Sequence, residues 1–186
     1  LDSFTLGAVP GGNSYYTHES GYLGMQLDLA LGDAPAATTN EAIFRQTGGQ
    51  IFVAHRDYPL LIGNANQPGR FILDNGILSS GLSFGNTNGV FEFNAGRVDS
   101  GDRDVIWGGV NSVTGAVQFA EEGTREISVH AGRTLTVNPV VRVEDTPWAA
   151  GSFLKNGDGA MRFAEGTVID LSGTVRVEAG TLAIQT

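Results

Sequence analysis

The chain has 186 residues, no cysteine and a formal charge of −9 at pH 7, with an isoelectric point near 4.6. This length suits one domain with a sizeable core. The absence of cysteine excludes disulfides, thiolate catalysis and thiolate-ligated zinc. The acidic balance argues against nucleic acid or an anionic membrane surface as a partner. With no apolar run of eighteen residues, no segment is expected to span a membrane as a helix.

Residues 1–40 form the least regular part of the sequence, and we expect an N-terminal cap or an irregular first coil there. Between residues 21 and 32 apolar side chains alternate with others, which indicates a pair of strands. The apolar positions on that face are Leu23, Met25, Leu27, Leu29 and Leu31. A cap would block end-to-end pairing of sheets, whereas a bare end would promote it.

Residues 38–44 leave two alternatives open. The letters Thr-Thr-Asn-Glu at 38–41 have the spacing of a helix capping box, which predicts a single helical turn. Residues 43–49, however, run directly into the alternating pattern of the following segments. We therefore favour a strand there.

From residue 41 to residue 186 the sequence repeats one unit, a short alternating strand followed by a glycine corner. Such units begin at Gly49, Gly69, Gly89 and Gly115, at intervals of twenty, twenty and twenty-six residues. A nearly constant interval with variable loops is typical of a solenoid in which each unit is one coil. We therefore predict an all-β fold, a single-domain parallel β-helix, and expect it to be right-handed because parallel crossovers are.

The last unit shows the inward positions most clearly, because apolar Val175, Val177, Leu182 and Ile184 alternate with polar neighbours. The same pattern predicts that the interior stacks Phe71, Leu73, Phe91, Phe93, Val117, Phe119, Val175 and Val177. An antiparallel β-sandwich is the alternative fold. It is kept open by the Asn-Gly pairs at 75–76, 88–89 and 156–157, which are typical of hairpin turns.

Residues 151–184 carry a more specific pattern: a leucine-lysine step, Gly-x-Gly, a strand, a loop and a closing Ala-Gly-Thr-Leu. The positions concerned are Leu154, Lys155, Gly157, Gly159, Met161, Phe163 and 179–182. This stretch resembles the autotransporter-associated (passenger-associated) β-strand repeat. The segments 46–49, 61–64, 69–78 and 89–98 are more loosely similar to repeats of large secreted bacterial proteins. The resemblance implies a β-solenoid at the bacterial cell surface or outside the cell, and no particular reaction.

Calcium is the one cofactor that the sequence suggests. Asp99, Asp102 and Asp104 offer carboxylate oxygens within one loop, which hard cations prefer. Their spacing matches neither the EF-hand nor the glycine-aspartate repeat of calcium-binding solenoids. A solvated acidic loop is therefore the alternative.

Signals for catalysis are few. Residues 81–85 fit the Gly-x-Ser-x-Gly string of a nucleophile elbow, but a loop and a strand follow where the elbow needs a helix. The histidines lie in different units: His18, His55 and His130. A polysaccharide lyase or hydrolase would need convergent lateral groups, for which the candidates are Asp74, Glu92, Arg97 and Asp99. Because no pair can be placed within reach, we expect no catalytic activity.

Aromatic residues outside the inward positions are candidates for contact with a ligand or partner, since flat rings suit sugars and protein surfaces. The main candidates are Tyr58, Trp107 and Trp148. Trp107 has a second interpretation as a core residue. Trp148 has one as a cover over the end of a coil.

These observations lead us to expect an extracellular structural or adhesive β-solenoid, a surface scaffold or self-assembling subunit. Self-association through the solenoid ends is the expected partner interaction. The alternatives are a glycan-binding adhesin module and a polysaccharide-cleaving enzyme. The chain begins at Leu1 and stops just after a strand, which we interpret as a processed product or an excised fragment.

Overall fold

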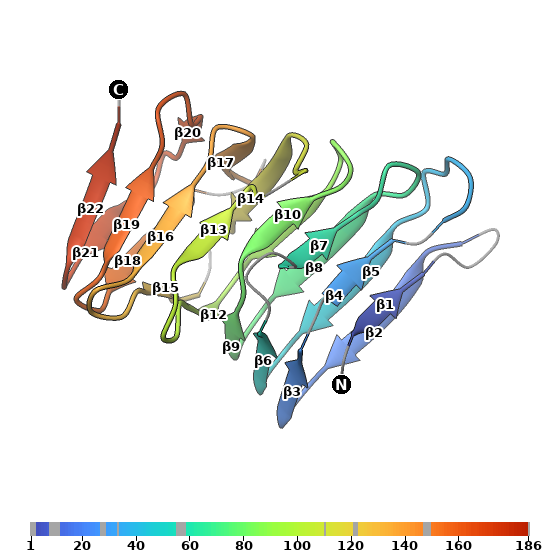
Figure 1. Ribbon diagram of the computed structural model, residues 1–186, viewed down its shortest axis with the longest axis horizontal. Coiled ribbons are helices and arrows are strands. Elements are labelled where there is room, and N and C mark those ends of the chain that lie inside the picture. Colours follow the sequence, from blue (N-terminus) through green and yellow to red (C-terminus); the bar gives the residue numbers. More distant parts are fainter. Residues whose placement is uncertain are drawn as a thin grey trace.

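The chain winds through three parallel β-sheets that face one apolar core (Figure 1). The computed structural model describes residues 3–7, 12–26, 29–32, 34–54, 59–109, 111–120, 123–146 and 150–185. In these residues every pairing between strands is parallel, and each strand pairs with the strand three places along the chain. The predicted parallel β-solenoid is confirmed. The antiparallel sandwich is wrong, because the Asn-Gly pairs turn corners between sheets instead of hairpins.

The strands of one coil are distributed over the three sheets in turn. The first sheet contains β1 (Phe4–Leu6), β4 (Leu29–Leu31), β7 (Leu60–Ile62), β10 (Leu82–Phe84), β13 (Val105–Trp107), β16 (Thr134–Val137), β19 (Ala160–Phe163) and β22 (Thr181–Ile184). The second contains β2 (Ser14–His18), β5 (Ala42–Gln46), β8 (Gly69–Leu73), β11 (Val90–Phe93), β14 (Gly115–Phe119), β17 (Val141–Asp145) and β20 (Ile169–Asp170). The third contains β3 (Tyr22–Met25), β6 (Gln50–Val53), β9 (Ile77–Ser79), β12 (Gly96–Asp99), β15 (Arg125–Ser128), β18 (Phe153–Asn156) and β21 (Val175–Val177).

The register aligns inward side chains of successive coils into columns, among them one along each sheet that runs from the first strand of that sheet to its last. The first column is Phe4, Leu29, Leu60, Leu82, Trp107, Val137, Phe163 and Ile184. The second is Tyr16, Phe44, Phe71, Phe91, Val117, Val143 and Ile169. The third is Leu23, Ile51, Leu78, Val98, Ile127, Lys155 and Val177. We call these the three inner columns.

Aromatic rings of successive coils lie next to one another along the second inner column. The ring centroids of Tyr16 and Phe44 lie 4.8 Å apart, and those of Phe44 and Phe71 lie 5.1 Å apart in nearly parallel planes. Phe71 and Phe91 follow at 5.8 Å. This spacing is close to the interstrand distance of about 4.8 Å, so each ring packs on the ring of the next coil.

Most of the predicted interior is confirmed, because Phe71, Leu73, Phe91, Phe93, Val117 and Phe119 are fully buried. Val175 is partly buried and packs against the core. Val177 is 44% exposed, which contradicts its prediction as a buried residue. Its column position is inward, but β21 is the last strand of its sheet and no described coil covers it.

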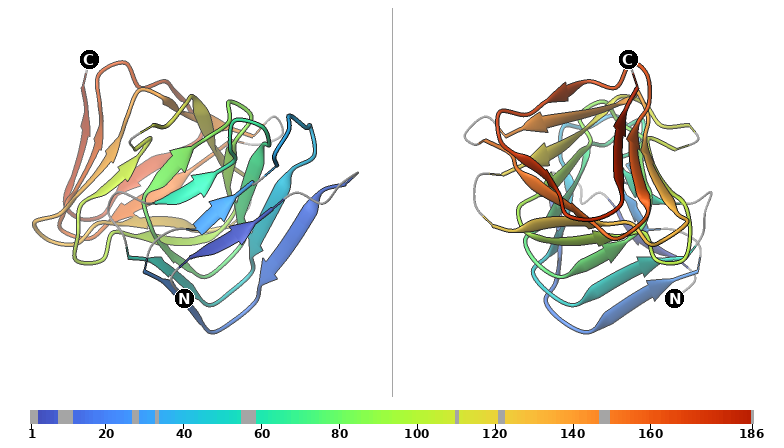
Figure 2. Two further views of the ribbon diagram at one scale, coloured as in Figure 1. Left: turned by 45° about the vertical axis from the view of Figure 1, so that its right-hand side comes forward. Right: turned by 90° about the vertical axis from the view of Figure 1, so that its left-hand side faces the viewer.

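Residues 1–40 contribute β1, β2, β3 and β4, which pair in register with the coils that follow. Ala42–Gln46 is strand β5, so the helical turn considered for residues 38–44 is wrong. Figure 2 shows the coils stacked one behind another, and in Figure 1 the chain termini lie at opposite ends of the stack. The described residues contain no helix long and apolar enough to cross a membrane.

Candidate functional site

Buried polar side chains brace the corners of the solenoid. Gln46, at the end of β5, is fully buried and its Nε2 donates to the carbonyls of Gly48 (3.3 Å), Gly49 (3.2 Å) and Ile77 (3.1 Å). These carbonyls belong to two successive coils. The amide therefore ties a corner to the corner stacked on it. A side chain at Gly76 would meet this brace, since an added Cβ would lie 2.8 Å from the Gln46 Nε2.

Lys155 braces another corner and belongs to the third inner column. Its Nζ donates to the carbonyls of Asn156 (2.8 Å), Gly157 (2.7 Å) and Ala179 (3.0 Å), and its side chain is fully buried. Burial lowers the pKa of Lys155, and the charge of Asp158 opposes this only in part. The lysine and the Ala-Gly step of the repeat resemblance therefore meet in space. Sequence reasoning matched both to a pattern but assigned neither a role.

Arg125 spans three coils in the same manner. It is buried at the start of β15, its Nε donates to the Ser152 carbonyl at 2.6 Å, and its Nη1 donates to the Asn94 carbonyl at 3.0 Å. Burial lowers the pKa of this guanidinium. The contacts connect the coil before Arg125 with the coil after it.

Arg103 links the loop after β12 to earlier coils. Its guanidinium donates to the carbonyls of Val53 and Ala54 and, at 3.3 Å, to that of Ser79. The guanidinium carbon also lies 4.8 Å from the centroid of the Phe52 ring, within cation–π range. Burial lowers the pKa of Arg103. Four of the chain's cationic or amide side chains are thus committed to holding backbone in place.

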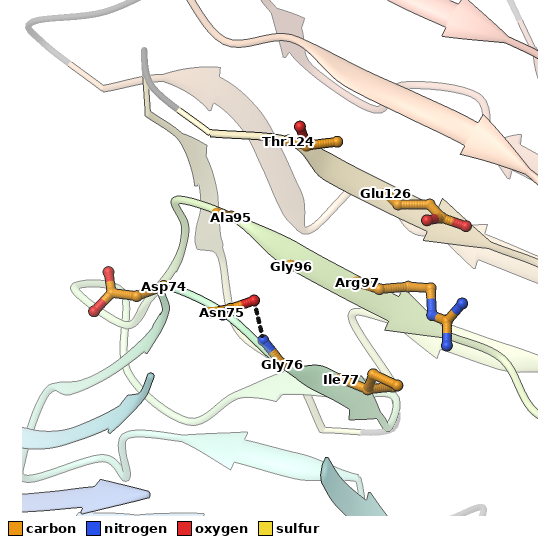
Figure 3. A pocket seen from close by; sticks show the side chains of 9 residues that line it. All are labelled: Asp74, Asn75, Gly76, Ile77, Ala95, Gly96, Arg97, Thr124 and Glu126. Carbon is orange, nitrogen blue, oxygen red and sulfur yellow. Dashed lines mark hydrogen bonds between the residues drawn. The ribbon is translucent and has the colours of Figure 1, made fainter. Parts of the chain in front are cut away.

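A hollow lies on the outer surface where the second sheet turns into the third (Figure 3). It is a shallow groove of about 640 Å³ lined by Asp74, Asn75, Gly76, Ile77, Ala95, Gly96, Arg97, Thr124 and Glu126. A second hollow of about 240 Å³ shares Thr124 and continues toward the C-terminal coils. We call the two together the corner groove. Figure 3 shows Arg97 and Glu126 side by side on β12 and β15, with Asp74 at the other end.

The charged groups of the corner groove are already paired with protein groups. Asp74 accepts from Arg45 and, at 2.9 Å, from Asn94. The Arg97 Nε lies 3.6 Å from an Asp99 oxygen. Glu126 accepts from the Asn156 side chain at 3.1 Å. The groove offers a mixed polar surface, not a set of unpaired groups that converge on one point.

Two of the predicted lateral carboxylates share one hydrogen-bond donor. Asp74 and Glu92 come together because the Asn94 Nδ2 donates to both, at 2.9 Å each. Glu92 also pairs with Arg70 at 3.3 Å, and Arg70 pairs with Glu41 at 3.2 Å. Burial would lower the pKa of Arg70, but the hydrogen bonds and charges of the two glutamates outweigh it and raise that pKa.

The predicted calcium ligands contact different partners. An Asp99 oxygen lies 3.0 Å from the His130 Nε2, and an Asp102 oxygen lies 3.6 Å from the His130 Nδ1. Asp104 instead accepts from the backbone N–H of Thr134 at 2.9 Å. Among the residues that the structure describes, no three His, Asp or Glu side chains form a group able to hold a metal ion.

The structure places only one of the three aromatic candidates for ligand contact. Trp107 is fully buried in the first inner column and its ring lies 6.1 Å from that of Phe91, so the prediction of a surface contact there is corrected to a core role. Tyr58 and Trp148 lie outside the described residues, as does His55. Ser83 is buried in the middle of strand β10 (Leu82–Phe84) and no described helix follows it, so residues 81–85 do not form a nucleophile elbow.

Comparison with known proteins found no matching family model, no matching curated protein and no matching solved structure. The structure itself shows a parallel β-solenoid.

Proposed function

We propose that this protein is a structural β-solenoid, an extracellular or bacterial-surface scaffold without catalytic activity. The observation that carries the proposal is the continuity of the three inner columns from β1, β2 and β3 to β20, β21 and β22. A repeat stack gains stability from each interface between neighbouring coils and transmits load along its axis. The corner braces add further links between coils. Continuous columns and links between coils suit a scaffold that holds neighbouring domains or molecules apart.

The polar groups support the same proposal. A glycosidase or lyase needs an acid and a base whose environments hold them in different protonation states near the substrate. Each of the three predicted lateral carboxylates instead lies beside an arginine, as Glu92 does beside Arg70 at 3.3 Å. The location outside the cell rests on the repeat resemblance of residues 151–184.

A polysaccharide assay tests this proposal. Purified protein incubated with polygalacturonate, alginate and a neutral glucan is expected to release no reducing ends or unsaturated products above the buffer control. Asp99→Asn and Glu92→Gln are expected to give the same result. Release by the unaltered protein that either substitution abolishes would show a catalytic site and would refute the scaffold role.

The corner groove favours a second candidate, a glycan-binding adhesin module, because it is long, open and mixed in polarity. A glycan array separates the two candidates. If the protein is a scaffold, we expect no glycan on the array to bind above background. Binding that is lost in Arg97→Ala, but kept in the control Arg142→Ala on the outer face of the second sheet, would replace the scaffold role with the adhesin role.

A further inference from the structure

Asn75 and Gly76 turn the corner between β8 and β9 and line the corner groove. The Gly76 N–H donates to the Oδ1 of the Asn75 side chain at 2.8 Å, a hydrogen bond that Figure 3 shows. It brings the Gly76 nitrogen up to the side-chain amide of Asn75. Gly76 has a φ of +96°, which glycine adopts readily, and it has no Cβ to hinder the approach. Asn75 is exposed, so water reaches the same amide.

The peptide group between Asn75 and Gly76 stands outside the backbone ladder. Within the described ranges, neither the Asn75 carbonyl nor the Gly76 N–H bonds to another backbone group. The ladder resumes at the next residue, where the Ile77 N–H donates to the Gly49 carbonyl at 2.9 Å. This peptide plane can therefore turn without breaking a hydrogen bond between coils.

We propose that Asn75 is a modification site at which the protein deamidates without an enzyme. The Gly76 nitrogen attacks the side-chain amide carbon of Asn75, its proton and the amide NH₂ leave as ammonia, and a succinimide ring closes. Water then opens the ring at either carbonyl, which gives aspartate or isoaspartate. Water is the only co-reactant, and each product carries a carboxylate where the amide was neutral. This chemistry is independent of the scaffold role.

The Asn-Gly pair at Asn156 and Gly157 has the same approach but is held in place. The Gly157 N–H donates to the Asn156 Oδ1 at 2.7 Å. The Asn156 carbonyl, however, accepts from the Lys155 Nζ at 2.8 Å and from the Val129 N–H at 3.0 Å. The Asn156 Nδ2 donates to a Glu126 oxygen at 3.1 Å. Closing a succinimide here requires these hydrogen bonds to break.

The pair at Asn88 and Gly89 lacks the approach altogether. Asn88 is exposed, but the Gly89 N–H donates to the Asn86 carbonyl at 2.9 Å. This hydrogen bond directs the attacking nitrogen away from the Asn88 side chain. The chain therefore contains two matched controls for Asn75, with the same sequence pair in different surroundings.

Peptide mass spectrometry follows the three sites in one sample. The folded protein is incubated in mildly alkaline buffer, digested in acid to stop the reaction, and the conversion of each asparagine is measured with time. Asn75 is expected to react about tenfold faster than Asn156, since breaking a hydrogen bond to a charged carboxylate costs roughly that factor. Asn88 is also expected to react more slowly than Asn75.

Unfolding in concentrated urea provides the control for sequence. The three rates are expected to converge there, because each site then depends only on its Asn-Gly pair. An isoaspartyl methyltransferase is expected to label the reacted folded protein, because a succinimide opens to isoaspartate as well as aspartate.

Two results would overturn the inference and leave the scaffold role untouched. One is a folded protein in which Asn75 stays intact or reacts no faster than Asn88 and Asn156. The other is conversion of Asn75 to aspartate alone, because direct hydrolysis without a succinimide gives no isoaspartate. Release of oligosaccharide in the polysaccharide assay would refute the scaffold role whatever happens at Asn75.

Discussion

Replacing Phe91 by alanine is expected to lower the free energy of unfolding by about 3–5 kcal/mol, because a fully buried aromatic ring leaves both lost burial and a cavity. The ring has neighbours on several sides, with centroids 5.8 Å from Phe71, 5.7 Å from Phe93 and 6.1 Å from Trp107. Two of these belong to other strands, so the cavity cannot close without moving neighbouring coils. Urea unfolding followed by circular dichroism measures the loss.

Val90→Ala is the matched control, since Val90 precedes Phe91 in β11 but faces outward and is only partly buried. Its expected loss is about 1 kcal/mol or less. Equal losses at the two positions would mean that the alternation in β11 does not sort side chains between core and solvent.

Replacing Lys155 by methionine is expected to lower the free energy of unfolding by about 2–4 kcal/mol, since each buried carbonyl left without a donor costs about 1–3 kcal/mol. Methionine fills similar space but cannot donate to the carbonyls of Gly157 and Ala179. The Asn156 carbonyl keeps one partner, the backbone N–H of Val129 at 3.0 Å. The same urea experiment measures the change, with the exposed Arg176→Met as a control expected to change little.

The pH dependence of this difference provides a second readout. Burial lowers the pKa of Lys155, so the unfolded chain binds its proton more tightly than the folded one. Stability of the unaltered protein therefore rises with pH up to the ordinary lysine value of about 10.4, and the methionine variant lacks this rise. The gap between the two proteins should widen from pH 7 toward pH ~10. A gap that narrows would show that Lys155 is not buried as described.

The fold could be predicted because period-two alternation and recurring glycines reflect backbone geometry directly. The glycine interval of twenty residues between Gly69 and Gly89 equals one coil, and the rings of Phe71 and Phe91 pack against each other at the same interval. The exposed position of Val177 could not be predicted, because alternation gives the direction of a side chain and not whether a further coil covers it.

The corner braces were missed for a physical reason. Gln46 and Lys155 occupy inward positions, although polar side chains are expected to face outward. They are stable there because the corner carbonyls of two successive coils accept their hydrogen bonds. The lateral pairing of Asp74 with Asn94 could have been predicted from the sequence. The two residues are twenty positions apart, which is one coil, so they lie at equivalent positions on successive coils. The contact of Asp99 with His130 was not, because the intervening loop changes the interval.

Amide hydrogen exchange along the intact chain tests most directly whether the protein is one stiff structural stack. We expect slow exchange, with similar opening free energies, through the inner strands β8, β11 and β14 and their neighbours. Faster exchange is expected only in the outermost strands, because a repeat stack opens from its ends. A set of inner strands that opens on its own, with far faster exchange than the coils on both sides, would reveal a hinge within the stack and contradict the scaffold role.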